Sequence, residues 1–236
     1  MNTTVPEISA AGLVVACLPA VIVIGLMAHW GARAGTAVYA TVRMLVQLAL
    51  IGYVLIYLFE TEHVAVIGGV LAIMLLVASR IAIQPLPARD PGHYRDAFVA
   101  ITCGSIPTLL LVTQGVIDIE PWFQPRYVIP LAGMIFASAM NTVSLAAERF
   151  HAEATTQAMP AARRVAFRAA MIPLVNSFLA VGLVTLPGMM TGQVLSGVSP
   201  LIAAKYQIVV MTMLFGASGI AAAIYLELRC RVRTRP

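Results

Sequence analysis

The chain has 236 residues, of which 60% are hydrophobic and only 11% are charged, and its mean hydropathy is +0.91. Such a composition lies far outside that of soluble globular proteins and predicts an integral membrane protein. The net charge of +5 is expected to reflect membrane topology, so it is no evidence of nucleic-acid binding.

Seven stretches of the chain are long and apolar enough to be membrane spans, for which about 20 apolar residues are needed. They use most of the chain and leave no room for a soluble catalytic domain. We therefore expect an all-α, polytopic integral membrane protein in which residues 1–236 form a single transmembrane domain. In chain order, the expected spans are 8–29, 37–59, 64–83, 97–116, 127–147, 170–186 and 201–228.

The basic residues predict the orientation of these spans. Of the 15 Lys and Arg residues, Arg126 and Lys205 would lie on one side of the membrane and all the others on the opposite side. Basic loops are retained in the cytoplasm during insertion. The sequence therefore predicts an external N-terminus and a cytoplasmic C-terminus.

Motifs of ATP binding and of catalysis are missing from the sequence. Lys205 is the only lysine and is followed by Tyr206, so there is no P-loop lysine before Ser or Thr. The sequence also has no HExxH, no GxSxG and no histidine cluster. We expect neither an enzyme nor a bound cofactor, and the sequence leaves any metal ligands unknown.

Polar residues recur along the fifth expected span. Ser138, Asn141, Ser144 and Glu148 follow one another at spacings that place them on one face of a helix. Such a face can form a hydrogen-bonded seam between helices or line part of a substrate path. The sequence leaves both interpretations open.

The segment 187–200 combines two prolines and several glycines with Thr191 and Gln193. It is too broken for a long helix and too uncharged for an ordinary external loop. Irregular backbone at membrane depth is tolerated where it is buried in protein or lines a wet cavity. We expect either a re-entrant, pore-mouth element or a plain external connecting loop. In the span that follows, Ala217/Ala221 and Ser218/Ala222 are small-residue pairs typical of close helix packing.

The longest polar segment is 148–169, which mixes Arg163, Arg164 and Arg168 with Phe167. One interpretation is an amphipathic helix lying on anionic lipid. The other is a cytoplasmic coupling helix that docks into a partner protein. The sequence does not distinguish them.

Several of these segments resemble the signature of one family, the bacterial iron-export ABC permeases (FetB-like) together with the aluminium-resistance permeases of plants. The resemblance covers nearly the whole chain, and its C-terminal part is the most specific. The chain differs from many members at Ala137–Ser138, where they carry Gly-Asn, and in a shorter cytoplasmic loop without the Gly of the EAA-like coupling motif. The resembling segments are 43–48, 130–135, 140–141, 144–145, 148–150, 173–177, 181–193, 197–200 and 205–211.

The resemblance implies a permease of the bacterial inner membrane that exports iron or another metal ion and works as a homodimer with a separate ATP-binding subunit. An ATP-independent secondary transporter or channel is the alternative, although the halves of the chain show no convincing repeat. The expected polar lining of the substrate path is Ser138, Asn141, Ser144, Asn176, Ser177, Thr191, Gln193, Lys205 and Gln207. The residues expected to contact the ATPase are Glu148, Arg149, Glu153, Arg163, Arg164 and Arg168.

Overall fold

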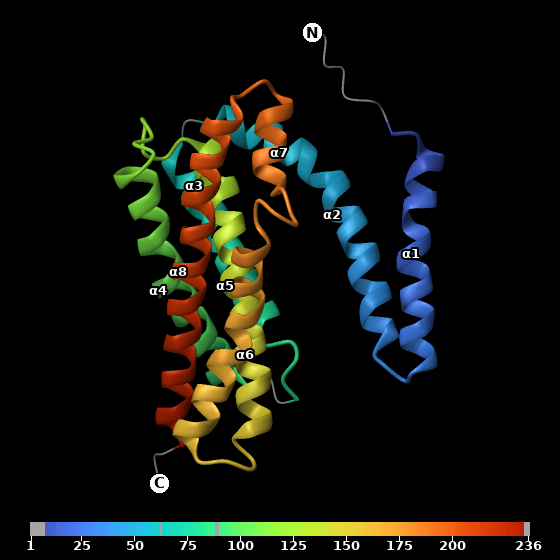
Figure 1. Cartoon of the computed structure of the whole chain (residues 1–236), viewed down its shortest axis with the longest axis vertical. Helices are drawn as coiled ribbons and strands as arrows, with labels where there is room; N and C mark the ends of the chain where they lie inside the picture. The colour runs from blue at the N-terminus through green and yellow to red at the C-terminus, as the bar shows by residue number, and fades with distance from the viewer. Residues whose placement is uncertain (1–7, 62, 88–89, 234–236) are drawn as a thin grey trace. The chain divides into compact units, whose positions relative to one another are not determined.

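The computed structural model describes residues 8–61, 63–87 and 90–233, and these residues fold into helices joined by turns (Figure 1). The ends of the expected domain, residues 1–7 and 234–236, lie outside the described residues. The chain divides into two compact units, Met1–Thr61 and Glu62–Pro236. They are called unit 1 and unit 2 below, and each is described by itself.

Unit 1 contains two long helices, α1 (Ala10–His29) and α2 (Ala34–Glu60). The side chain of Ser9 begins α1 by accepting a hydrogen bond from the Gly12 amide at 3.1 Å. Gly31, at φ +68°, turns the chain between the two helices. No side chain of α1 is buried, and Leu58 is the one buried side chain of α2. Most of the large exposed side chains of both helices are apolar, which suits a hydrocarbon environment.

The described residues of unit 2 form six helices, and the last of them lies at the centre of the unit. α8 (Pro200–Arg233) packs against α4 (Pro91–Gly115), α5 (Pro125–Glu153), α6 (Met159–Ala180) and α7 (Gly188–Leu195). The remaining helix, α3 (Val64–Ala82), packs against α4 and α5. Figure 1 shows this bundle, with the short α7 beside the beginning of α8.

The helices of unit 2 begin where the sequence supplies start signals. Asp90 caps α4 by accepting a hydrogen bond from the His93 amide at 2.7 Å, and Pro91 follows at the first helical position. Pro125 and Pro200 likewise open α5 and α8. Proline suits this position because its fixed φ is already helical and its missing amide hydrogen would have no partner.

Small residues let α4 and α8 approach closely. A Cβ atom added to Gly104 of α4 would lie 2.5 Å from the carbonyl oxygen of Ala217 and 2.9 Å from the amide nitrogen of Ala221. Ala217, Ser218 and Ala221 of α8 are fully buried. The predicted packing role of this small-residue face is therefore confirmed. Because the face is used inside the chain, Ala217 and Ala221 are not available for the dimer interface that such a face could otherwise supply.

Six helices of the described residues are long and apolar enough to cross a membrane: α1, α2, α3, α4, α5 and α8. They match six of the seven expected spans. The remaining expected span, 170–186, falls on α6, which begins earlier, at Met159, and ends at Ala180. α6 ends there because Gly182 adopts φ +80° and the amides of Val184 and Thr185 turn back to the Ala180 carbonyl. α6 is not among the six helices because its first half carries three arginines.

The segment 148–169 forms a helical hairpin instead of one interfacial helix. α5 continues to Glu153, residues 154–158 make the turn, and α6 begins at Met159. The Glu153 carbonyl accepts hydrogen bonds from the amides of Thr156 and Gln157, which closes the turn. Pro160 in the first turn of α6 then favours a new helix start. The two polar helix ends lie side by side in consequence.

Candidate functional site

The two ends of unit 2 differ in charge. α3, α5 and α8 finish at one end, where α4 and α6 begin (Figure 1), and this end carries Arg80, Arg95, Arg149, Arg163 and Arg229. We call it the basic end. α7 and the beginnings of α5 and α8 lie at the other end, which carries Arg126 and Lys205. We call it the α7 end. The candidate substrate residues and the candidate ATPase contacts divide largely between these two ends.

Gln193 of α7 lines a cavity of about 440 Å³ at the α7 end. Its side-chain oxygen Oε1 is buried and has no hydrogen-bond partner among the described residues. Arg126 and Tyr206 also line the cavity, as do the thioethers of Met134 and Met189. A buried amide oxygen without a partner carries an uncompensated desolvation cost, so it marks a place where a solute or water can bind.

Gln207 of α8 lines a neighbouring cavity of about 460 Å³. The residue is 6% exposed, and its Oε1 also lacks a hydrogen-bond partner among the described residues. The rest of this cavity is mostly apolar, with Phe178 of α6, Met190 of α7 and Met211 of α8. Two of the expected substrate residues thus present unpaired amide oxygens beside the α7–α8 contact.

Lys205 is exposed and lines a smaller cavity of about 240 Å³ with Tyr206, Val209 and Ile117. Tyr206 and Ile117 also line the Gln193 cavity, so the two cavities share a wall. The structure therefore brings Gln193 and Lys205 to the same end of unit 2, around Tyr206.

The polar face of α5 is only partly used for packing. Ser138 Oγ lies 2.8 Å from Ser218 Oγ of α8 and forms a hydrogen bond that joins the two helices. Ser144 is half-buried, while Asn141 and Glu148 are exposed. Ser138 thus forms the hydrogen bond expected of a seam between helices, whereas Asn141 and Glu148 are directed away from the core of unit 2.

Three further substrate candidates lie apart from these cavities. Asn176 and Ser177 are exposed on α6, and Ser177 Oγ donates to its own helix at the Pro173 carbonyl, 2.8 Å away. Thr191 is exposed on α7 and donates to the Pro187 carbonyl at 3.1 Å. Neither hydroxyl is held toward the Gln193 or Gln207 cavity by these bonds.

The hairpin between α5 and α6 holds the first group of expected ATPase contacts. Arg149 forms an ion pair with Glu153 at 2.6 Å, one turn further along α5. Glu153 also accepts a hydrogen bond from Gln157 in the turn. Glu148 and Arg168 are exposed. The ion pair between Arg149 and Glu153 thus stabilises the hairpin, while Glu148 and Arg168 are exposed on its surface.

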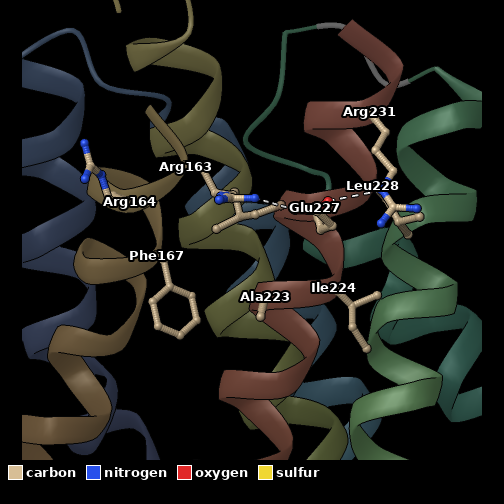
Figure 2. A pocket seen from close by; sticks show the side chains of 9 residues that line it. Arg163, Arg164, Phe167, Ala223, Ile224, Glu227, Leu228 and Arg231 are labelled. Atoms are coloured by element: carbon tan, nitrogen blue, oxygen red, sulfur yellow. Dashed lines mark hydrogen bonds and ion pairs between the residues drawn. The ribbon is translucent and has the colours of Figure 1, made fainter. Parts of the chain in front are cut away.

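The second group lies between α6 and α8. Arg163 pairs with Glu227 of α8, and Arg231 pairs with the same carboxylate at 3.1 Å (Figure 2). Arg164 is exposed and forms no ion pair within the described part of the chain. The structure therefore ties Arg163 to α8, a contact that the sequence did not indicate.

A buried polar cluster at the basic end was missed by the sequence analysis. Asp96 of α4, whose side chain is 1% exposed, forms an ion pair with Arg229 of α8 at 3.2 Å. Arg229 also contacts His93 Nε2 at 3.0 Å, and His93 Nδ1 lies 2.9 Å from the hydroxyl of Tyr225. The exposed side chain of Arg95 completes the cluster by binding the second oxygen of Asp96 at 3.1 Å.

The partners of His93 fix its hydrogen-bonding roles. An arginine can only donate, so Nε2 must accept from Arg229 and carries no hydrogen. Nδ1 then carries the hydrogen and donates it to the oxygen of Tyr225. The imidazole is neutral in this arrangement, and the cluster is a chain of oriented hydrogen bonds that joins α4 to α8. The Tyr225 oxygen accepts from His93 in this arrangement, so the cluster is suited to holding α4 and α8 together.

The described residues hold no group of three or more His, Cys, Asp or Glu side chains that could bind a metal ion together.

Comparison with known proteins places this architecture in a family. The profile described as "Uncharacterised protein family (UPF0014)" matches residues 9–159 and 153–232. The chain belongs to the UPF0014 family. No solved structure was found to match the chain.

Relatives of the UPF0014 family carry membrane and transport names. The "UPF0014 membrane protein slr1647" of Synechocystis is 37% identical over 198 residues, which are 76% of this chain and 76% of that protein. The "Probable iron export permease protein FetB" of Escherichia coli is 35% identical over 208 residues, 80% of this chain and 78% of that protein. "Protein ALUMINUM SENSITIVE 3" of Arabidopsis thaliana is 33% identical over 204 residues, 80% and 73% of the two chains. The resemblance noted in the sequence is therefore confirmed.

Proposed function

We propose that this chain is the membrane permease subunit of an ABC-type exporter for iron or another metal ion. A separate ATP-binding subunit would hydrolyse the ATP, and two copies of the permease would form the membrane part in the bacterial inner membrane. The observation that carries this proposal is the 35% identity to the protein named as a probable iron export permease, over 208 residues. The absence of a P-loop lysine from the sequence supports an ATPase on another chain.

The charge difference between the ends of unit 2 supports a cytoplasmic basic end. Arg149, Arg163 and Arg229 gather where α5 and α8 finish and α6 begins. Basic segments are retained in the cytoplasm, so the C-terminus of α8 would be cytoplasmic and α7 external. On this orientation α6 and residues 181–187 make one further crossing, which brings the total to seven, since α6 begins at the basic end and α7 follows at the other end. The N-terminus would then be external.

The hairpin between α5 and α6 is the proposed docking element for the ATPase. Its exposed charges, Glu148 and Arg168, and the internally paired Arg149 and Glu153 suit a polar partner. Closure of the ATPase dimer on ATP would move the hairpin. α6 would pass the motion to α8 through the pair between Arg163 and Glu227.

The proposed substrate contacts are the unpaired amides at the α7 end. Gln193 and Gln207 each present a buried oxygen without a partner in the described part of the chain, beside cavities of about 440 and 460 Å³. Motion of α8 relative to α7 would change both cavities, because α8 lines both and α7 contributes to each. Lys205 would contribute from the smaller cavity at the same end. Other polar candidates, among them Asn141, Ser144 and Asn176, would contribute from other faces of the bundle.

Affinity purification from native membranes tests the proposal. The permease is extracted in a mild detergent, and the co-purifying proteins are identified and quantified. An ATP-binding subunit recovered at about equal stoichiometry, with ATPase activity that responds to metal ions, is the expected result. A homo-oligomer without any ATPase, under conditions that keep a control ABC complex intact, would favour an ATP-independent carrier and overturn the proposal.

A further inference from the structure

A groove of about 640 Å³ runs between the first half of α6 and the last part of α8. Its walls are mainly apolar: Phe167 extends from α6, and Ala223, Ile224 and Leu228 come from α8. In Figure 2, Phe167, Ala223 and Ile224 lie below the charged residues, with the ring of Phe167 between the two helices. The groove is therefore an apolar slot with a charged entrance.

The entrance is strongly basic. Arg163, Arg164 and Arg231 line it together with a single carboxylate, that of Glu227, which leaves a net charge of two positives. Arg163 uses one nitrogen for Glu227, and a guanidinium has five hydrogens to donate, so Arg163 can bind a second acceptor. Arg164 has no ion pair among the described residues and is exposed.

The groove lies where the surface of unit 2 changes from charged to apolar. Beyond Phe167, the exposed residues of α6 include Ile172, which is 52% exposed, and Leu179, which is 72% exposed. On α8, Ile220 is 47% exposed, one turn before Ala223 and Ile224. Such surfaces face hydrocarbon in a membrane protein, while arginines at a helix end reach the headgroup region. The slot is therefore at acyl-chain depth and its entrance at phosphate depth.

We propose that this groove binds one anionic phospholipid. The phosphate of the headgroup accepts hydrogen bonds from Arg164 and Arg163, and an acyl chain lies against Phe167, Ala223 and Ile224. Basic pockets between membrane helices are suited to anionic lipid headgroups. A small soluble anion would leave the apolar slot unfilled, and a soluble protein would approach from the water beyond the charged entrance, so neither matches both parts of the groove.

Lipid titration of the purified permease, without any ATPase, tests this inference independently of the proposed function. The protein is delipidated in detergent and titrated with phosphatidylglycerol or phosphatidylcholine, and bound lipids are counted by native mass spectrometry. Wild type should bind one phosphatidylglycerol in preference to phosphatidylcholine. Arg164→Ala should weaken phosphatidylglycerol binding roughly fivefold, as loss of one cation near an anionic lipid predicts.

Arg168→Ala is the matched control, because Arg168 lies on the same helix, is equally basic and exposed, and does not line the groove. It should keep the wild-type preference. Ala223→Trp should fill the slot and weaken the binding of both lipids, while circular dichroism checks that the helices are intact.

Four results would overturn the inference. The first is equal lipid binding by wild type and Arg164→Ala, and the second is an equal loss in Arg164→Ala and Arg168→Ala. The third is complete competition by millimolar inorganic phosphate, which would indicate a small-anion site. A change from dimer to monomer in Ala223→Trp with lipid binding unchanged would instead show that a second copy of the chain covers the groove.

Discussion

Replacing Asp96 with alanine should destabilise unit 2 by about 3–5 kcal/mol, the usual cost of removing one partner of a buried ion pair. The side chains of Asp96 and Arg229 are 1% and 10% exposed, so the arginine left behind would be desolvated without its counter-ion. His93 remains as an acceptor for Arg229, which favours the lower half of that range. The destabilisation should appear as loosening between α4 and α8.

The assay is reversible unfolding in mixed micelles by SDS titration, with hydrogen exchange of α8 as a local readout. A loss of about 3 kcal/mol corresponds to an increase of roughly a hundredfold in local opening. Arg95→Ala is the matched control: it removes the other partner of the same carboxylate, but Arg95 is 71% exposed, so the loss should stay within about 1 kcal/mol. The double variant Asp96→Asn/Arg229→Gln should lose less than the two single variants together. Equal stabilities of Asp96→Ala and Arg95→Ala would refute the reasoning.

Three further predictions concern the packing and the polar residues of unit 2, and the same unfolding assay applies to each. Gly104→Ala should lower the free energy of unfolding by about 1–3 kcal/mol, because its Cβ would clash with the backbone of α8. Gly69→Ala, with open space around it, should leave stability unchanged or raise it. Similar effects of the two substitutions would contradict the close approach of α4 and α8. Ser138→Ala should lower the free energy of unfolding by about 0.6 kcal/mol, because the hydrogen bond to Ser218 of α8 is lost. Ser144→Ala should lower it by less. A larger loss in Ser144→Ala would argue against a hydrogen-bonded seam at Ser138. Gln207→Met removes a buried amide oxygen without a partner in the described part of the chain, so stability should stay unchanged or rise by about 1–3 kcal/mol. Transport in proteoliposomes that also contain the ATPase should fall. Lower stability with intact transport would instead make Gln207 a structural residue.

The sequence predicted most of the helices because their signals are local. Long apolar runs marked six helices, and the small-residue steps of Ala217/Ala221 marked the buried face of α8. The sequence predicted a span beginning at residue 170, whereas α6 begins at Met159, because its first turns carry arginines and are not hydrophobic. The turn that ends it depends on Gly182, whose positive φ is a structural fact and not a hydropathy signal.

The buried cluster at the basic end was out of reach for a related reason. The expected fourth span began at residue 97, which left His93 and Asp96 in a loop, although the Asp90–Pro91 start signal could have extended that helix. Their partners on α8 are more than a hundred positions away in the chain. Contacts of that kind depend on how helices pack, so one sequence without such information cannot supply them.

The same limit applied to the candidate site. The sequence could select Gln193 and Gln207 as polar groups in an apolar region, but their positions in the chain do not reveal that they line different cavities. It could also select the charges of the 148–169 segment. It could not tell that Arg163 bonds to Glu227 across the bundle while Arg168 is exposed on the same helix.

The central position of α8 has a consequence for biosynthesis. Among the described helices α8 is synthesised after the other seven, yet α4, α5, α6 and α7 all pack against it. Before residues 200–233 have been translated, Gly104 of α4 and Ser138 of α5 therefore lack their contacts with α8. Insertion and packing are thus separate stages for unit 2, and a premature stop within α8 would leave inserted helices for quality-control proteases to remove.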